Sequence, residues 1–174
     1  MDRNALRALI PDETRLRFGE DIAPEYLSDT LGRLRGKASA LVFVRSTEEV
    51  SAVMKYAYAR NIPVTPRGAG TNLVGSTVPL DGGIILDLSQ MNRVLELDAD
   101  TMTVTVEPGL LLQDLQAYVE ARGLFYPPDP GEKASSIGGN ISTNAGGMRA
   151  VRYGVTRDYV LGMEVVLANG DILT

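Results

Sequence analysis

The sequence contains neither cysteine nor histidine among its 174 residues. The missing cysteine excludes disulfide bonds, thiolate nucleophiles, iron–sulfur clusters ligated within the chain and thiolate zinc sites. The missing histidine excludes the commonest general base, the commonest metal ligand and every Ser-His-Asp triad. Any chemistry in this chain therefore depends on carboxylates, Lys, Tyr, hydroxyls, backbone amides or a bound cofactor.

Excess positive charge and long apolar runs are absent as well. Lys and Arg number 17 against 22 Asp and Glu, and the net charge of −5 argues against nucleic-acid binding. No apolar run approaches the roughly 18 residues that a transmembrane helix needs, and no signal peptide is recognisable. The hydrophobic share of 44% is typical of a globular protein. We therefore expect a globular, cytoplasmic protein of one domain or two small lobes.

The clearest local patterns alternate between strands and helices. Residues 40–45 predict a buried strand, and the capping box Ser46-x-x-Glu49 predicts the start of a helix. Residues 62–65 predict a second strand, so the unit favours a parallel pair with a right-handed crossover. Elsewhere the patterns predict helices at 4–9, 13–18 and 112–123, a flexible basic link at 29–39, strands at 84–88, 124–126 and 160–168, and a hairpin of 94–97 with 102–107.

The end of the sequence carries the strongest hairpin turn signal, Asn169-Gly170. The chain stops four residues after this turn, whereas a strand usually has about five or six residues. We therefore expect these residues to be the N-terminal part of a longer protein, truncated at the C-terminus.

Glycine is abundant, with 18 residues of 174, and it gathers in two loops. The first loop, residues 66–77 (PRGAGTNLVGST), follows a predicted strand. It lacks the lysine of a P-loop and the strand–turn–helix context of a dinucleotide-binding G-x-G-x-x-G motif. Glycines permit a close backbone approach to a ligand, and successive N–H groups can form an anion-binding nest. The loop is thus suited to a diphosphate; the alternative is an ordinary turn-rich loop.

The second loop, residues 129–147 (DPGEKASSIGGNISTNAGG), combines small residues with hydroxyls and amides. Such a surface suits a flat polar ring laid against the backbone. The alternative is that Gly138-Gly139 only allow one chain segment to pack tightly on another. Two loops of this kind in one small chain favour a shared ligand.

Four motifs, taken in order, resemble a known family. They are PRGAGTNLVGS, VEPG (106–109), SSIGGNISTNAGGMRAVRYG (135–154) and LGMEVVLANGD (161–171). Together they resemble the FAD-binding domain of the vanillyl-alcohol-oxidase (PCMH-type) flavoenzymes, in the branch of glycolate oxidase subunit GlcD and D-lactate dehydrogenase. The resemblance implies a mixed α/β (α+β), two-lobed fold with FAD extended between the lobes.

The resemblance also implies which residues bind FAD. The predicted pyrophosphate loop comprises Arg67, Gly68, Ala69, Gly70, Thr71, Asn72, Gly75 and Ser76. The segment expected along the isoalloxazine and ribityl chain comprises Pro130, Ser135, Ser136, Gly139, Asn140, Ser142, Thr143 and Gly146. For Arg67 the alternative to a phosphate ligand is an inter-loop hydrogen-bond donor.

The same resemblance sets the expected domains and reaction. It implies an N-terminal helical and loop segment at 1–39, a first α/β lobe at 40–108 and the start of a second lobe at 109–174. It implies oxidation of a small 2-hydroxy acid of the glycolate or D-lactate type by hydride transfer to FAD, and an iron–sulfur partner subunit. The catalytic residues are expected beyond Thr174, so none is named and the 174 residues alone are expected to be inactive.

One departure from the family concerns the attachment of FAD. Some relatives attach FAD through a histidine at the position of Thr71, so non-covalent FAD is expected here. Two alternatives remain open at this stage. One is a nucleotide-binding or assembly domain without redox activity. The other is the same FAD domain serving a different substrate, such as a phenol or a sugar lactone.

Overall fold

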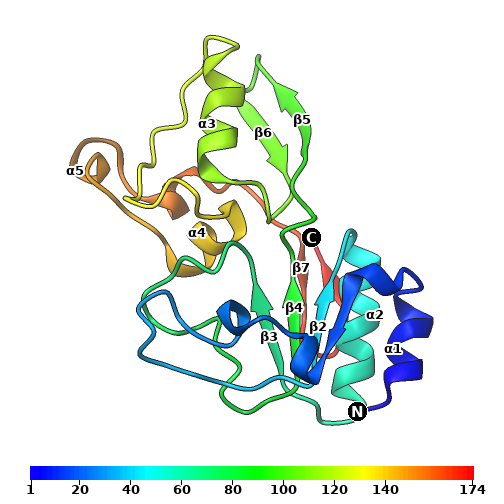
Figure 1. Ribbon diagram of the computed structural model, residues 1–174. Helices are drawn as coiled ribbons and strands as arrows, with labels where there is room; N and C mark the ends of the chain where they lie inside the picture. Colours follow the sequence, from blue (N-terminus) through cyan, green and yellow to red (C-terminus); the bar gives the residue numbers. More distant parts are fainter.

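The computed structural model describes residues 1–174 and places them in two lobes, one above the other (Figure 1). The lower lobe contains a four-stranded sheet, and the upper lobe contains a two-stranded hairpin with three helices beside it. The predicted mixed α/β fold is confirmed. None of the helices is long and apolar enough to span a membrane.

The lower lobe is built around a mixed sheet with the strand order β1-β2-β4-β3. Strands β2, β3 and β4 run parallel, and β1 pairs antiparallel with β2. The predicted strand–helix–strand unit is present, but β4 lies between its two strands. Its elements are α1 (Arg3–Leu9), β1 (Leu16–Phe18), β2 (Ala40–Phe43), α2 (Thr47–Tyr58), β3 (Val64–Arg67) and β4 (Ile84–Asp87), with three short 3-10 turns at Glu13–Arg15, Gly19–Asp21 and Pro24–Tyr26.

Helix α2 begins at the predicted cap. The Ser46 hydroxyl accepts a hydrogen bond from the Glu49 N–H at 3.3 Å. The Glu49 carboxylate does not complete the capping box, because it binds the buried Arg15 guanidinium at 2.7 and 2.9 Å. Val50, Val53 and Ala57 of α2 are buried in the main core beside residues of the sheet.

The N-terminal segment is more regular than the sequence predicts. The helix expected at 4–9 is confirmed as α1, but the helix expected at 13–18 is wrong. Asp12 caps a single 3-10 turn, and the chain then extends as β1. Leu16 and Phe18 are both buried while Arg17 between them is not, which is the alternation of a strand rather than of a helix.

The upper lobe contains β5 (Val94–Asp98), β6 (Thr103–Val106), α3 (Leu112–Glu120), α4 (Ile137–Thr143), α5 (Ala150–Tyr153) and a 3-10 turn at Thr156–Tyr159. The predicted hairpin and the helix ending near Gly123 are confirmed. Leu112, Leu115 and Val119 of α3 form a second core, against which the hairpin packs. Residues 124–126 form no strand, so that prediction is wrong.

The C-terminal hairpin returns to the lower lobe. Of the strand predicted at 160–168, only β7 (Val165–Val166) is paired, with β8 (Ile172–Leu173). The predicted turn is confirmed, with Gly170 at φ +85°. The Ser51 hydroxyl of α2 donates to the Gly170 carbonyl at 2.6 Å. We therefore propose a different division from the one expected: the first lobe includes residues 1–39 and the C-terminal hairpin, and the second lobe begins near Val94.

Candidate functional site

The first glycine-rich loop leaves the carboxyl end of β3, and we call residues 68–76 the glycine loop. Gly70 and Gly75 both have φ of +73°, a conformation that favours glycine. The Asn72 side chain shapes the loop from within. Its amide donates to the Thr77 hydroxyl at 3.0 Å, and its oxygen accepts from Val74 N–H at 3.3 Å and Ser76 N–H at 3.2 Å.

A row of backbone donors in this loop has no acceptor in the protein. The N–H groups of Gly70, Thr71 and Asn72 form no hydrogen bond with other residues of the chain. All three residues are partly exposed to solvent. Consecutive free N–H groups beside a glycine with positive φ form an anion-binding concavity. The geometry therefore fits the predicted diphosphate ligand without a lysine.

The second glycine-rich segment meets the glycine loop at Ser136. The Ser136 hydroxyl caps α4 by accepting from Gly139 N–H at 3.3 Å, and it also accepts from Ala69 N–H at 3.4 Å. A side chain at Gly68 would collide with this hydroxyl. The two predicted loops thus lie against each other, with the first turn of α4 at their junction.

The glycines of the second segment have different surroundings. Gly138 packs on Pro108, where an added Cβ would lie 2.7 Å from the proline Cβ. Gly147 leaves no room for a side chain beside the Asp129 backbone. Gly139, in contrast, is exposed. Tight packing therefore accounts for Gly138 and Gly147, while Gly139 leaves an open surface on α4.

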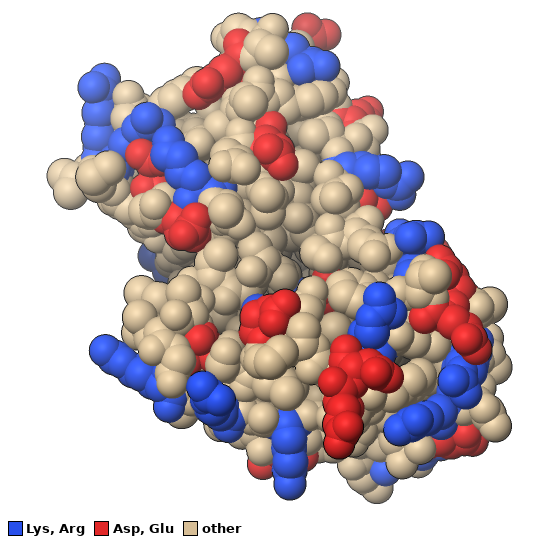
Figure 2. All heavy atoms as spheres, in the orientation of Figure 1, with Lys and Arg blue, Asp and Glu red and all other residues tan.

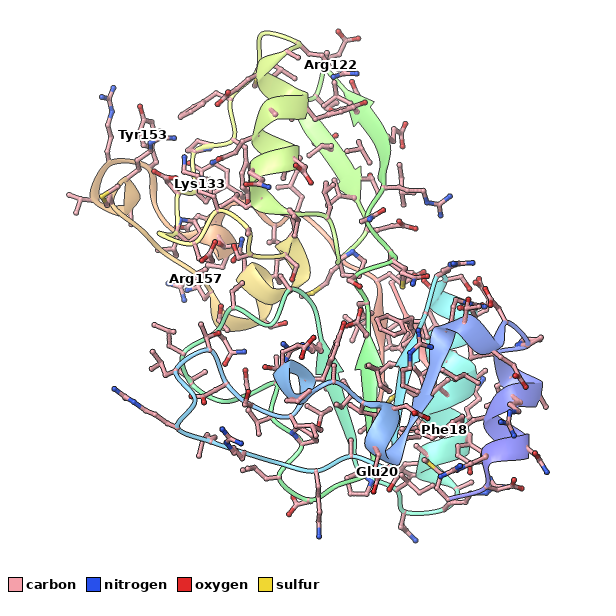
Figure 3. The ribbon with its side chains drawn as sticks, viewed as in Figure 1. Phe18, Glu20, Arg122, Lys133, Tyr153 and Arg157 are labelled. Atoms are coloured by element: carbon pink, nitrogen blue, oxygen red, sulfur yellow. The ribbon has the colours of Figure 1, made fainter.

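One buried polar atom of this segment, the Ser135 hydroxyl, has no hydrogen-bond partner, whereas the buried Asp129 carboxylate is held by two ion pairs. The Asp129 carboxylate lies 3.6 Å from Lys133 Nζ and 3.5 Å from Arg149 Nε. Figure 3 shows Lys133 on the side of the upper lobe that carries α5. Unpaired buried polar atoms are costly unless a ligand or water satisfies them. The unpaired Ser135 hydroxyl therefore fits a polar ligand at this segment.

The remaining predicted residues are distributed around this junction. Asn140 lies buried within α4, and Pro130 is buried in the segment before it. The hydroxyls of Ser142 and Thr143 donate to carbonyls one turn earlier in the helix, at 2.8 and 2.9 Å. Gly146 follows the helix and contacts Val155.

A cavity of about 440 Å³ lies beside this junction. It is lined from one side by Ala69 and Ser89 and from the other by Gly109, Leu110 and Asp114. These residues come from the glycine loop, from the end of β4 and from the start of α3. Figure 2 shows that the molecule narrows to a waist where the two lobes meet. An elongated ligand can therefore contact both lobes at once.

Arg67 occupies the base of the glycine loop rather than its surface. The side chain is buried and donates to the Glu25 carbonyl at 3.1 Å and to the Thr77 hydroxyl at 3.4 Å. Burial lowers the pKa of Arg67, and burial also raises the pKa of Asp87, its register partner on β4. These contacts match the inter-loop donor alternative; direct phosphate binding by Arg67 stays a prediction.

Sequence reasoning missed the contribution of residues 24–37 to this site. Thr30 and Leu34 from that segment contact the glycine loop, yet they lie about 40 residues away in the sequence. No motif marks them, because their contacts are to a backbone carbonyl and to a glycine.

Known proteins resemble this chain in both sequence and fold. A family model described as "FAD binding domain" matches residues 38–174. The chain belongs to this FAD-binding domain family. The match begins at residue 38, just before β2, and includes the glycine loop, α4 and the C-terminal hairpin.

Several curated relatives of this family member are hydroxy-acid enzymes by name. Glycolate oxidase subunit GlcD of Bacillus subtilis is 47% identical over 160 residues, which is 91% of this chain and 32% of that protein. D-lactate dehydrogenase of Anaerostipes hadrus is 48% identical over 161 residues, 91% of this chain and 34% of that protein. Mitochondrial D-2-hydroxyglutarate dehydrogenase of Danio rerio is 42% identical and covers 99% of this chain and 32% of its own length. The chain thus spans about a third of the length of these relatives.

Solved structures of lower identity share the fold. Alkyldihydroxyacetonephosphate synthase superposes with a TM-score of 0.86 at 23% identity, covering 99% of this chain and 34% of that chain. Xylooligosaccharide oxidase from Myceliophthora thermophila gives a TM-score of 0.80 at 20% identity, covering 97% of this chain and 36% of that chain. These likenesses show that the chain shares its fold with these proteins.

Proposed function

We propose that this chain is the FAD-binding portion of a flavin-dependent oxidoreductase that oxidises a small 2-hydroxy acid. The observation that carries the proposal is the row of unpaired N–H groups at Gly70, Thr71 and Asn72, which lies beside α4 in a member of the FAD-binding domain family. FAD carries two linked phosphates and a flat polar ring, and both have a complementary surface here.

The residues divide into two roles in this proposal. The N–H groups of the glycine loop hold the pyrophosphate, because backbone donors need no neutralising lysine. The Ser135 hydroxyl and the exposed surface at Gly139 face the ribityl and ring portion. FAD, when bound, supplies the hydride-accepting chemistry, and the protein supplies binding and orientation. We assign no catalytic base within these residues.

The substrate class follows from the relatives. Those named for glycolate, D-lactate and D-2-hydroxyglutarate all act on 2-hydroxy acids by name. We propose the same substrate class for the protein to which this chain belongs, together with a cytoplasmic location and an iron–sulfur partner subunit to accept electrons. Anaerobic addition of glycolate, D-lactate or D-2-hydroxyglutarate to the full-length flavoprotein tests this, since one of them should bleach the flavin absorption bands. Bleaching by a phenol or a sugar lactone alone would assign another substrate class.

The mode of attachment is a separate part of the proposal. Because Thr71 occupies the position of the histidine that some relatives use, and because the chain has no cysteine, FAD is held non-covalently. Acid precipitation of the FAD-loaded protein should release all yellow colour into the supernatant. Colour that stays with the pellet would contradict non-covalent binding, and a colourless protein that takes up no added FAD would favour a domain without redox activity.

A further inference from the structure

A segment outside the predicted cofactor ligands wraps the glycine loop. We call residues 24–37 the strap; it runs alongside the loop on one side of the lower lobe (Figure 1). The Thr30 hydroxyl donates to the Gly70 carbonyl at 3.1 Å. At Gly75 an added side chain would collide with Leu34. Lys37 N–H donates to the Pro79 carbonyl at 3.0 Å, just beyond the loop. The strap therefore touches the loop near both of its glycines with positive φ.

The side chain of Arg67 also joins these two segments. Its guanidinium donates to the Glu25 carbonyl of the strap and to the Thr77 hydroxyl, one residue beyond the glycine loop. It also stacks over the Tyr26 ring, with 5.1 Å between the guanidinium carbon and the ring centroid. A side chain at Gly70 would collide with the guanidinium, so the loop backbone rests directly on it.

The charge of Arg67 is not neutralised by direct contact. No carboxylate lies within 4.0 Å of its nitrogens. Both of its hydrogen bonds end on neutral oxygens. The buried Asp87 carboxylate, the register partner of Arg67 on β4, favours the charged form of Arg67 from beyond that distance. A buried cation without a direct ion pair is still costly in free energy, and an anion bound on the loop would offset part of that cost. Anion binding at the loop and the placement of Arg67 therefore favour each other.

We propose that Arg67 is a positioning residue that couples the strap to the glycine loop, so that binding of the FAD diphosphate stabilises residues 24–37 against local opening. This inference rests on the proposed function. By linkage, FAD must stabilise the ordered strap by the same factor by which the ordered strap tightens FAD binding. The strap is then part of the cofactor site even though it provides no predicted FAD ligand.

Limited trypsin digestion reads out this coupling, because the strap carries three exposed cleavage sites at Arg33, Arg35 and Lys37. Saturating FAD should slow cleavage in the strap of the full-length protein by about 5-fold or more, within the range usual for coupled sites. Cleavage at the exposed Arg122, at the end of the upper lobe, serves as the internal reference (Figure 3). Equal protection at Arg122 and in the strap would overturn the proposal, since it would mean only general stabilisation.

Two variants distinguish a loss of the coupling between strap and glycine loop from a general loss of folding. Arg67→Lys keeps the charge but loses the forked hydrogen bonds, and Thr30→Val removes only the hydroxyl that reaches Gly70. Both should reduce the FAD protection of the strap to less than about 2-fold and weaken FAD binding by a matching factor. Thr101→Val, in the turn between β5 and β6, is the matched control and should behave as the wild-type chain. Full strap protection in a folded Thr30→Val chain would overturn the coupling.

The digestion also distinguishes failure of this inference from failure of FAD binding. If the full-length wild-type protein does not quench FAD fluorescence, the proposed cofactor is wrong. The contact between Arg67 and the strap can then be tested without FAD. In the cofactor-free protein, Arg67→Lys should speed cleavage within the strap relative to cleavage at Arg122. An unchanged ratio would overturn the role of Arg67.

Discussion

The side chain of Asn72 offers a direct test of whether the shape of the glycine loop matters for binding. Asn72→Ala removes three hydrogen bonds within the loop, to Val74, Ser76 and Thr77. Each hydrogen bond contributes about 1 kcal/mol net, so the upper limit is about 3 kcal/mol. Because the loop is partly exposed, water replaces some of these partners, and we expect about 1.5 kcal/mol. That loss corresponds to about 10-fold weaker FAD binding.

Quenching of FAD fluorescence on titration with protein measures this change. Asn169→Ala is the matched control, since Asn169 likewise stabilises a turn through its side chain, but in the C-terminal hairpin. It should leave FAD affinity unchanged. Unaltered FAD affinity in Asn72→Ala would refute the inference that the unpaired N–H groups must be held in place by the loop.

Three further substitutions test the packing around the site. Glu49→Gln removes the carboxylate that accepts two hydrogen bonds from the buried Arg15 and leaves that guanidinium with one ion pair, the longer one with Asp12 at 3.6 Å. It should cost about 2–3 kcal/mol at pH 7 in urea denaturation, less than for a fully buried pair. Hydrogen bonds from Arg15 hold the pKa of Glu49 below its ordinary value, so this stabilisation is complete above the unfolded pKa of about 4.3 and is lost as pH falls through the lower folded value. The difference between the two proteins should therefore vanish near pH 2; a constant difference would contradict the ion pair. Gly138→Ala should destabilise by about 1–3 kcal/mol through its clash with Pro108, and an unchanged melting temperature would contradict that packing. Gly170→Ala should loosen the C-terminal hairpin, seen as faster amide exchange at its turn, because its φ of +85° and its contact with α2 both exclude a side chain.

Much of the fold could be predicted from patterns that involve only a few neighbouring residues. The capped helix α2, the β5–β6 hairpin and the turn at Asn169-Gly170 each carry a strong signal over a few neighbouring residues. Helix α4 was not predicted from the sequence, because its two glycines have poor helix propensity. It forms because Ser136 caps it and Ile137 enters the second core.

Other elements depend on partners that a sequence pattern does not reveal. Strand β1 is three residues long and exists because β2 pairs with it. The apolar run at 160–168 predicts one strand, but only Val165 and Val166 within it pair with β8. For the candidate site, the motifs predicted the two loops, and their meeting at Ser136 agrees with a shared ligand. The strap was missed because it acts through the Glu25 carbonyl, which no side-chain pattern encodes.

The central claim is that the unpaired backbone donors at Gly70, Thr71 and Asn72 bind the diphosphate of FAD. Fluorescence titration of the full-length protein with FAD and with riboflavin, which lacks phosphate, tests it most directly. The account predicts saturable, reversible binding of one FAD per chain, competition by ADP, and binding of riboflavin at least about 10-fold weaker, the loss expected when charge-assisted hydrogen bonds are absent. No quenching by the protein, or equal affinity for FAD and riboflavin, would contradict it.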